Sequence, residues 1–208
     1  MINLTESQKS NQYLMDQLPT ETLQFIAGMW INGKYLWLHD CTEKVIYEEE
    51  IIIKVKEEQP HSKIRLSTVY VSNHSKQTKE IKVLAMHHYS PVCQDNLTFV
   101  SPLDHHIFHH GNKRMFLVNA KHEGAGMKEY TAVPKWNVYT DRIWSSLQKG
   151  SLTYQPMAKG PAASVFAMKM STAPHGTSKM STWTITGADK NELISIEQAL
   201  FKNTSISF

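Results

Sequence analysis

The chain has 208 residues, of which 22 are lysine or arginine and 19 are aspartate or glutamate, so its formal net charge is +3. Hydrophobic residues make up 41% of the chain, which is typical of a globular protein whose core needs no disulfide bonds. No run approaches the roughly 18 apolar residues of a transmembrane helix. The first residues lack the basic and apolar regions of a signal peptide. We therefore expect a cytoplasmic protein, either free or incorporated into a particle or coat, with no membrane span.

The charges are unevenly distributed along the chain. Residues 1–104 contain 10 basic and 13 acidic side chains, whereas residues 105–208 contain 12 basic and 6 acidic ones. A basic half can face nucleic acid or an acidic partner. However, the basic residues include just three arginines, Arg65, Arg114 and Arg142, and the lysines are scattered singly. Because sequence-reading proteins rely on clustered arginines, we predict no specific nucleic-acid binding.

The first 27 residues have the pattern of a helical arm. Ser10 or Asn11 is placed to cap a short helix that ends before Pro19, and Thr20 is placed to cap a second helical turn over residues 21–26. The sequence therefore predicts an N-terminal helical segment over residues 1–27, followed by a β-domain over residues 28–208.

From residue 28 onward the pattern is typical of strands. Apolar residues flank Asn32-Gly33 in the segment MWINGKYLWL, which predicts a β-hairpin with a type I′ turn. In the strand predicted at residues 63–73, the alternation changes phase near Ser67, which indicates a β-bulge. Further strands are predicted at residues 45–58, 80–89, 96–102, 114–120 and 130–139.

The C-terminal third continues this pattern. Residues 140–150 predict a short helical segment, three more strands follow, and ELISIEQALF (residues 192–201) fits either a strand or a short helix. Strands about 8–12 residues apart, without long helices between them, predict an antiparallel β-sandwich or barrel-like fold. We expect one continuous domain. The alternative is a seam at residues 140–162, where glycines and prolines gather.

A histidine cluster is the most unusual feature of the sequence. Its members are Asp104, His105, His106, His109 and His110, preceded on a predicted strand by His87 and His88. Neutral imidazole is a good ligand for zinc, nickel, copper or iron. Two His-x3-His spacings place pairs of imidazoles on one face of either a strand or a helix. If the strand with His87 and His88 lies nearby, the cluster predicts a metal site with an open position.

Two other interpretations of the cluster stay open. Adjacent histidines on a strand point to opposite faces, so the run before Gly111-Asn112 is also explained by solvated or hydrogen-bonded side chains. Because imidazoles titrate near pH 6.5, the cluster is alternatively a pH sensor. We expect no cofactor, with a bound transition metal as the alternative.

Aromatic residues give a second candidate site, a binding surface made of Trp30, Trp37 and Trp136. Tryptophan on a sheet stacks on sugars or fills a protein interface, although core or cross-strand packing is the favoured explanation for Trp30 and Trp37. Glycan binding is not favoured, because most such modules are exported.

The function expected from the sequence is non-catalytic. The chain has no Walker phosphate loop, no GxSxG nucleophile elbow and no HExxH motif. We expect a binding, structural or assembly protein that acts through sheet edges and loops on a protein partner or on itself. A bacterial or phage particle, coat or appendage is one such setting. The alternative is a metal-dependent enzyme with a histidine-rich site on a β-sandwich or cupin-like barrel.

Overall fold

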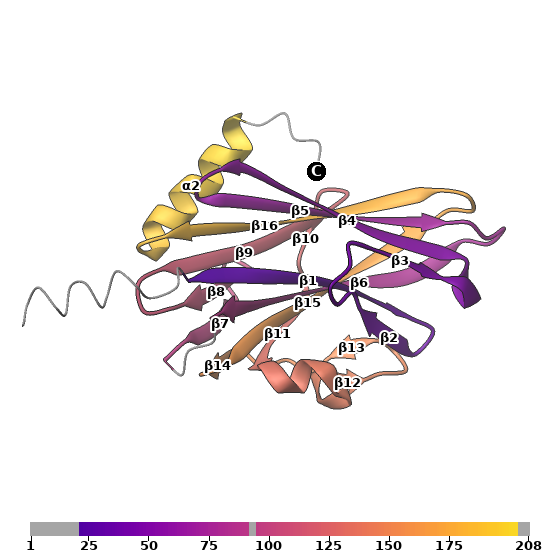
Figure 1. Ribbon diagram of the computed structural model, residues 1–208, viewed down its shortest axis with the longest axis horizontal. Coiled ribbons are helices and arrows are strands. Elements are labelled where there is room, and N and C mark those ends of the chain that lie inside the picture. Colours follow the sequence, from indigo (N-terminus) through magenta and orange to yellow (C-terminus); the bar gives the residue numbers. More distant parts are fainter. Residues whose placement is uncertain (1–20, 92–94, 204–208) are drawn as a thin grey trace, which may run out of the picture.

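The computed structural model describes residues 21–91 and 95–203. About 60% of these residues lie in strands, and the strands form two main antiparallel sheets (Figure 1). The mainly β, antiparallel prediction is therefore confirmed. No helix within the two described ranges is long and apolar enough to cross a membrane.

The five-stranded sheet, called sheet A here, contains the first hairpin. Its strands in spatial order are β11 (Glu129–Pro134), β15 (Ala162–Thr172), β6 (Lys79–Ser90), β1 (Thr22–Ile31) and β2 (Lys34–Trp37). Asn32 and Gly33 connect β1 to β2 with φ values of 49° and 77°, as a type I′ turn requires. The predicted hairpin is confirmed.

The nine-stranded sheet, called sheet B, carries the histidine-rich strand β8 third from its β14 edge. Its order is β14 (Met157–Lys159), β7 (Leu97–Ser101), β8 (His106–His110), β9 (Met115–His122), β16 (Thr177–Gly187), β5 (Ile64–Asn73), β4 (Ile51–His61) and β3 (Glu43–Ile46), with β10 (Ala125–Gly126) paired to β9. The remaining elements are the pair β12 (Trp144–Ser146) and β13 (Ser151–Leu152), the 3-10 helices η1 (Tyr47–Glu49), η2 (Lys135–Tyr139) and η3 (Asp141–Ile143), and helix α2 (Lys190–Asn203).

The predicted N-terminal helix is not found in the described residues. Residues 1–20 lie outside them, and the second predicted helical turn is wrong because Thr22 begins strand β1. Leu23, Ala27 and Met29 face the core between the sheets, so their two-residue period continues the pattern of the hairpin. The run at residues 192–201, which fitted a strand or a helix, is part of helix α2.

Apolar side chains cover both faces of each sheet. Val83 of sheet A and Val118 of sheet B belong to the core that the two sheets share. On the outer face of sheet A, Leu84 belongs to a second apolar cluster with the segment at residues 135–152. On the outer face of sheet B, Trp183 packs in a third cluster with helix α2. Figure 1 shows α2 and the β12–β13 segment on opposite outer sides of the molecule.

The change of phase along residues 63–73 has a different cause from the predicted bulge. The register of β5 against β16 is unbroken, so β5 itself has no bulge at Ser67; a register shift in the neighbouring strand β4, between Glu58 and His61, lies opposite Ile64 and Leu66. Ile64 and Leu66 point outward into the cluster under α2, whereas Val69 and Val71 point inward to the shared core. Because α2 covers one end of the outer face, the apolar residues of β5 change face partway along the strand.

The chain crosses between the two sheets on both sides, and one of these sides is left partly open. Gln155 and Pro156 accept backbone hydrogen bonds from Ala132 of β11 and Val100 of β7, both at 2.8 Å, and so bridge the sheets. These bridging residues belong to residues 140–162, where the alternative seam was predicted. On the opposite side, residues 38–42 cross from β2 to β3: Leu38 donates to the Ala27 carbonyl of β1 at 2.8 Å, and Thr42 accepts from Val55 of β4 at 2.7 Å. Beyond this crossing, no backbone hydrogen bond within the described ranges joins residues 22–26 of β1 to residues 56–61 of β4. We call this side the β1–β4 opening.

A buried carboxylate fixes helix α2 to sheet B. Glu197 is 5% exposed and accepts hydrogen bonds from Asn119 and from the Trp183 indole N–H, both at 2.9 Å, and its other oxygen lies 2.8 Å from His106 Nε2. Burial raises the pKa of Glu197, but these hydrogen bonds outweigh burial and hold the pKa below its usual value. A charged acceptor with three partners therefore sets the position of α2.

We expect Glu197→Ala to lower the free energy of unfolding by about 2–4 kcal/mol, because it leaves side chains on β8, β9 and β16 without their acceptor. Urea denaturation measures this change. Gln198→Ala, at an exposed position of the same helix, should change the value by less than about 0.5 kcal/mol. Equal effects of the two substitutions would contradict the anchoring role of Glu197.

Candidate functional site

The histidines of the predicted metal cluster point in different directions. Strand β8 sends His106 outward to Glu197 and His109 inward toward sheet A, whereas His110 is exposed. His105 lies in the preceding turn with φ +54°, and its Nδ1 lies 3.2 Å from the Tyr130 hydroxyl. No group of three histidine, cysteine, aspartate or glutamate side chains in the described residues is placed to hold a metal ion. Metal binding by this cluster stays a prediction.

Asp104 and His88 also have partners outside the cluster. Asp104 accepts hydrogen bonds from Lys190 at 3.0 Å and from Ser101 at 2.9 Å, and these bonds lower its pKa. His88 Nδ1 lies 3.0 Å from the Tyr89 carbonyl, on the outer face of β6. Burial lowers the pKa of His88. Both side chains are thus engaged in local structure.

His87 and His109 lie between the sheets. His109 is fully buried, with Nδ1 at 3.0 Å from the Thr98 hydroxyl and Nε2 at 2.8 Å from the Ser164 hydroxyl. His87 is opposite Ser164 in the register of β6 and β15, and its ring lies 5.2 Å from that of Phe25. Although Ser164 and His109 form a serine–histidine pair, both are 0% exposed, so solvent does not reach them.

Burial keeps both core imidazoles neutral. It lowers the pKa of His87 to about 3, with a smaller contribution from His88, and it lowers the pKa of His109 well below its usual value. The two rings therefore act as polar core residues in their uncharged form. Protonation of either ring would place a charge in the shared core.

The three predicted binding-surface tryptophans have different exposures. Trp30 packs against the outer cluster of sheet A and donates its indole N–H to the Leu147 carbonyl at 2.8 Å. Trp37 is 7% exposed in the same cluster, whereas Trp136, in η2, is 60% exposed. The structure therefore does not place the three indoles on one exposed surface.

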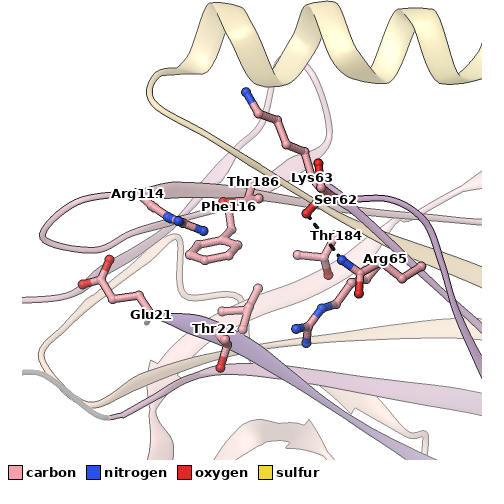
Figure 2. A pocket seen from close by; sticks show the side chains of 11 residues that line it. Glu21, Thr22, Ser62, Lys63, Arg65, Arg114, Phe116, Thr184 and Thr186 are labelled. Carbon is pink, nitrogen blue, oxygen red and sulfur yellow. Dashed lines mark hydrogen bonds between the residues drawn. The ribbon is translucent and has the colours of Figure 1, made fainter. Parts of the chain in front are cut away.

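The β1–β4 opening is the candidate site that the structure brings forward. Along it, residues 22–26 of β1 have no backbone partner on the side away from β6 within the described ranges. A groove of about 750 Å³ lies at one end, lined by Gln24, Phe25 and Ile26 of β1 together with Glu57 of β4. At the other end, a pocket of about 120 Å³ reaches between the sheets (Figure 2).

The two ends of the opening differ in charge. The groove is lined by the acidic side chains Asp40, Glu43 and Glu57. The pocket is lined by the basic side chains Lys63, Arg65 and Arg114 and by one acidic residue, Glu21. The opening therefore runs from an acidic end to a basic end along the free edge of β1.

The sequence analysis did not single out this site. Residues 21–26 were interpreted as a helical turn, so the uncharged strand edge at residues 22–26 was not recognised. Arg65 and Arg114 lie 49 positions apart in the sequence. They come together only because β9 and β5 both pair with β16. The one signal available was the run TLQFIAGMWI, ten residues without a charge.

We expect acid to destabilise the fold through His87 and His109. Below the usual histidine pKa of about 6.5, the unfolded chain takes up protons that the folded chain does not bind, so stability is full above that pH and falls toward pH 3. Each ring should contribute a slope of about 1.4 kcal/mol per pH unit in this window. Urea denaturation between pH 7.5 and 4.5 measures the free energy of unfolding at each pH. In His87→Phe, the slope of this free energy against pH should be smaller by the contribution of one ring.

His110→Gln, at an exposed position of β8, is the matched control and should leave the slope of stability against pH unchanged. The comparison uses slopes, so a change in overall stability from repacking at position 87 does not affect it. An identical slope in wild type and His87→Phe would contradict the neutral, buried state of this ring.

Comparisons with family models and curated sequences assign no family to the chain. No protein family model matches the chain, and no curated protein sequence matches it significantly. Because one β-fold hosts many activities, function has to be inferred from named residues and their geometry. The features that carry such an inference are the uncharged free edge of β1 and the charged ends of the β1–β4 opening.

Proposed function

We propose that the protein is a non-catalytic β-sandwich with one open side, and that it assembles by pairing the β1 edge with the same edge of a second copy. The observation that carries this proposal is the free, uncharged edge at residues 22–26. Unpaired N–H and C=O groups on an edge strand are a template for another strand. Self-pairing would satisfy these groups without any other component.

The other edges of the opening have features that oppose strand pairing. Strand β4 carries the Lys56–Glu58 ion pair and Pro60, which has no N–H to donate, along its free end. Strand β3 has Glu43 and Lys44. Charges and prolines on edges block unwanted pairing, and residues 22–26 of β1 have neither. This contrast favours β1 as the edge that receives a partner.

The charge distribution along the opening favours a second copy as that partner. Two β1 edges paired antiparallel are related by a two-fold axis, so each copy offers the same surface. With the axis at Gln24, Thr22 of one copy lies opposite Ile26 of the other. The basic end near Arg114 then approaches the acidic end near Asp40 of the other copy. The opening is thus complementary to itself in charge.

The proposal predicts a concentration-dependent dimer of the 23.8 kDa chain in light scattering after size exclusion. Gln24→Lys places a charge on the exposed edge, next to the same charge of the second copy. It should raise the dissociation constant of the dimer at least about tenfold, which corresponds to roughly 1.4 kcal/mol, because like charges opposite each other destabilise strand pairs.

The matched control is Gln198→Lys, which adds the same charge at an exposed position of α2, away from the opening. This variant should dimerise like the wild type. A wild-type monomer at every concentration would overturn the proposal. Equal dimerisation of the wild type and Gln24→Lys would exclude the β1 edge as the interface.

A further inference from the structure

The pocket at the basic end of the β1–β4 opening has a distinct chemistry of its own. Its volume is about 120 Å³, and it is lined by two of the chain's three arginines, Arg65 and Arg114, together with Lys63. Figure 2 shows Arg114 and Arg65 on either side of Phe116 and Thr184, whereas the Lys63 side chain extends toward α2. We propose that this pocket binds a small oxyanion, a phosphate or carboxylate group.

The pocket exists because the apolar residues of sheet B change face beneath α2. Trp183 and Ile185 of β16 point outward to the helix, so the alternate residues Thr184 and Thr186 point inward. Arg65 pairs with Thr184 in the register of β5 and β16 and shares its face. At this end, the surface facing sheet A is therefore polar and cationic instead of apolar.

The hydrogen-bond donors of the pocket are available to a ligand. Neither Arg65 nor Arg114 forms an ion pair with any residue in the described ranges, whereas Lys63 is paired with Glu192. The Glu21 carboxylate accepts the backbone N–H groups of residues 112 and 113. The two guanidinium groups therefore keep donors that suit the two or more oxygens of an anion.

Thr186 adds an independent observation. It lines the pocket, and its buried hydroxyl oxygen has no hydrogen-bond partner among the described residues. A buried polar atom without a partner costs free energy, so a bound acceptor or donor at this position would be stabilising. Thr186 lies beside Phe116 in the register of β16 and β9, at the base of the polar surface.

The size of the pocket limits the ligand. A volume of about 120 Å³ corresponds to roughly four water molecules at about 30 Å³ each. This space suits one anionic group. Leu23 and Phe116 give the pocket an apolar wall, with 4% and 5% exposure. Because both arginines are exposed, we expect affinity on the order of a millimolar dissociation constant.

Phosphate titration followed by calorimetry and ³¹P line broadening tests the proposal, with sodium chloride at matched ionic strength as the reference. The protein should be held at a concentration where light scattering gives a monomer. Wild type should bind phosphate saturably, and Arg65→Gln or Arg114→Gln should weaken binding about tenfold by removing charge-assisted hydrogen bonds. Arg142→Gln removes the third arginine, in η3 outside the pocket, and should bind like wild type.

Three results would overturn the proposal: no saturable binding, an equal effect of sodium chloride, or an equal loss of binding in Arg142→Gln. All lining residues come from one chain, so failure to dimerise would leave this test unaffected. Two further measurements identify the source of the oxyanion. Acetate binding with the same dependence on Arg65 and Arg114 would indicate a carboxylate. If phosphate also dissociates the dimer, the carboxylate comes from a second copy.

Discussion

The structure depends on one constraint: both sheets carry apolar residues on both faces, so each outer face needs a cover. Strand β6 shows this most clearly, since Val83 faces the shared core and its neighbour Leu84 faces outward. The segment at residues 135–152 covers sheet A, and helix α2 covers sheet B. Each cover is fixed by polar contacts as well as by apolar burial. The Trp30 indole N–H donates to the Leu147 carbonyl beneath the first cover, and Glu197 contacts side chains of three strands, β8, β9 and β16, beneath the second.

The position of the covers also determines where the molecule stays open. Residues 153–161 run from the β12–β13 pair through β14 of sheet B to β15 of sheet A, which connects the sheets on the β11–β14 side. Both covers pack on outer faces, so neither covers the side between β1 and β4. At the α2 end, apolar residues turned outward leave Arg65 and Thr184 facing inward. The free edge and the cationic pocket are thus consequences of the same packing arrangement.

The local features of the fold were predictable from sequence, and the features that depend on distant partners were not. The Asn32-Gly33 hairpin was predicted correctly, because its turn chemistry is contained in adjacent residues. The first residues of strand β1 were misassigned as a helical turn, because Thr20 followed by Glu21 resembles the capped start of a helix. The supposed bulge at Ser67 was wrong because the position of α2, which lies more than a hundred residues later, decides which face is apolar.

The histidine-rich segment illustrates the same limit at the level of a site. His105 to His110 are neighbours along the chain, but the alternation of side chains along β8 places His106 and His109 on opposite faces of sheet B. One imidazole meets a carboxylate of α2 and the other meets a hydroxyl of β15, partners that come 91 and 55 positions later. Histidines that are close in the sequence therefore lie on different sides of sheet B. Conversely, Arg65 and Arg114, which no sequence motif links, line one pocket because β16 pairs with β5, which carries Arg65, and with β9, which begins directly after Arg114. In an antiparallel fold of this kind, the chemistry of a site follows from strand register more than from the spacing of residues along the chain.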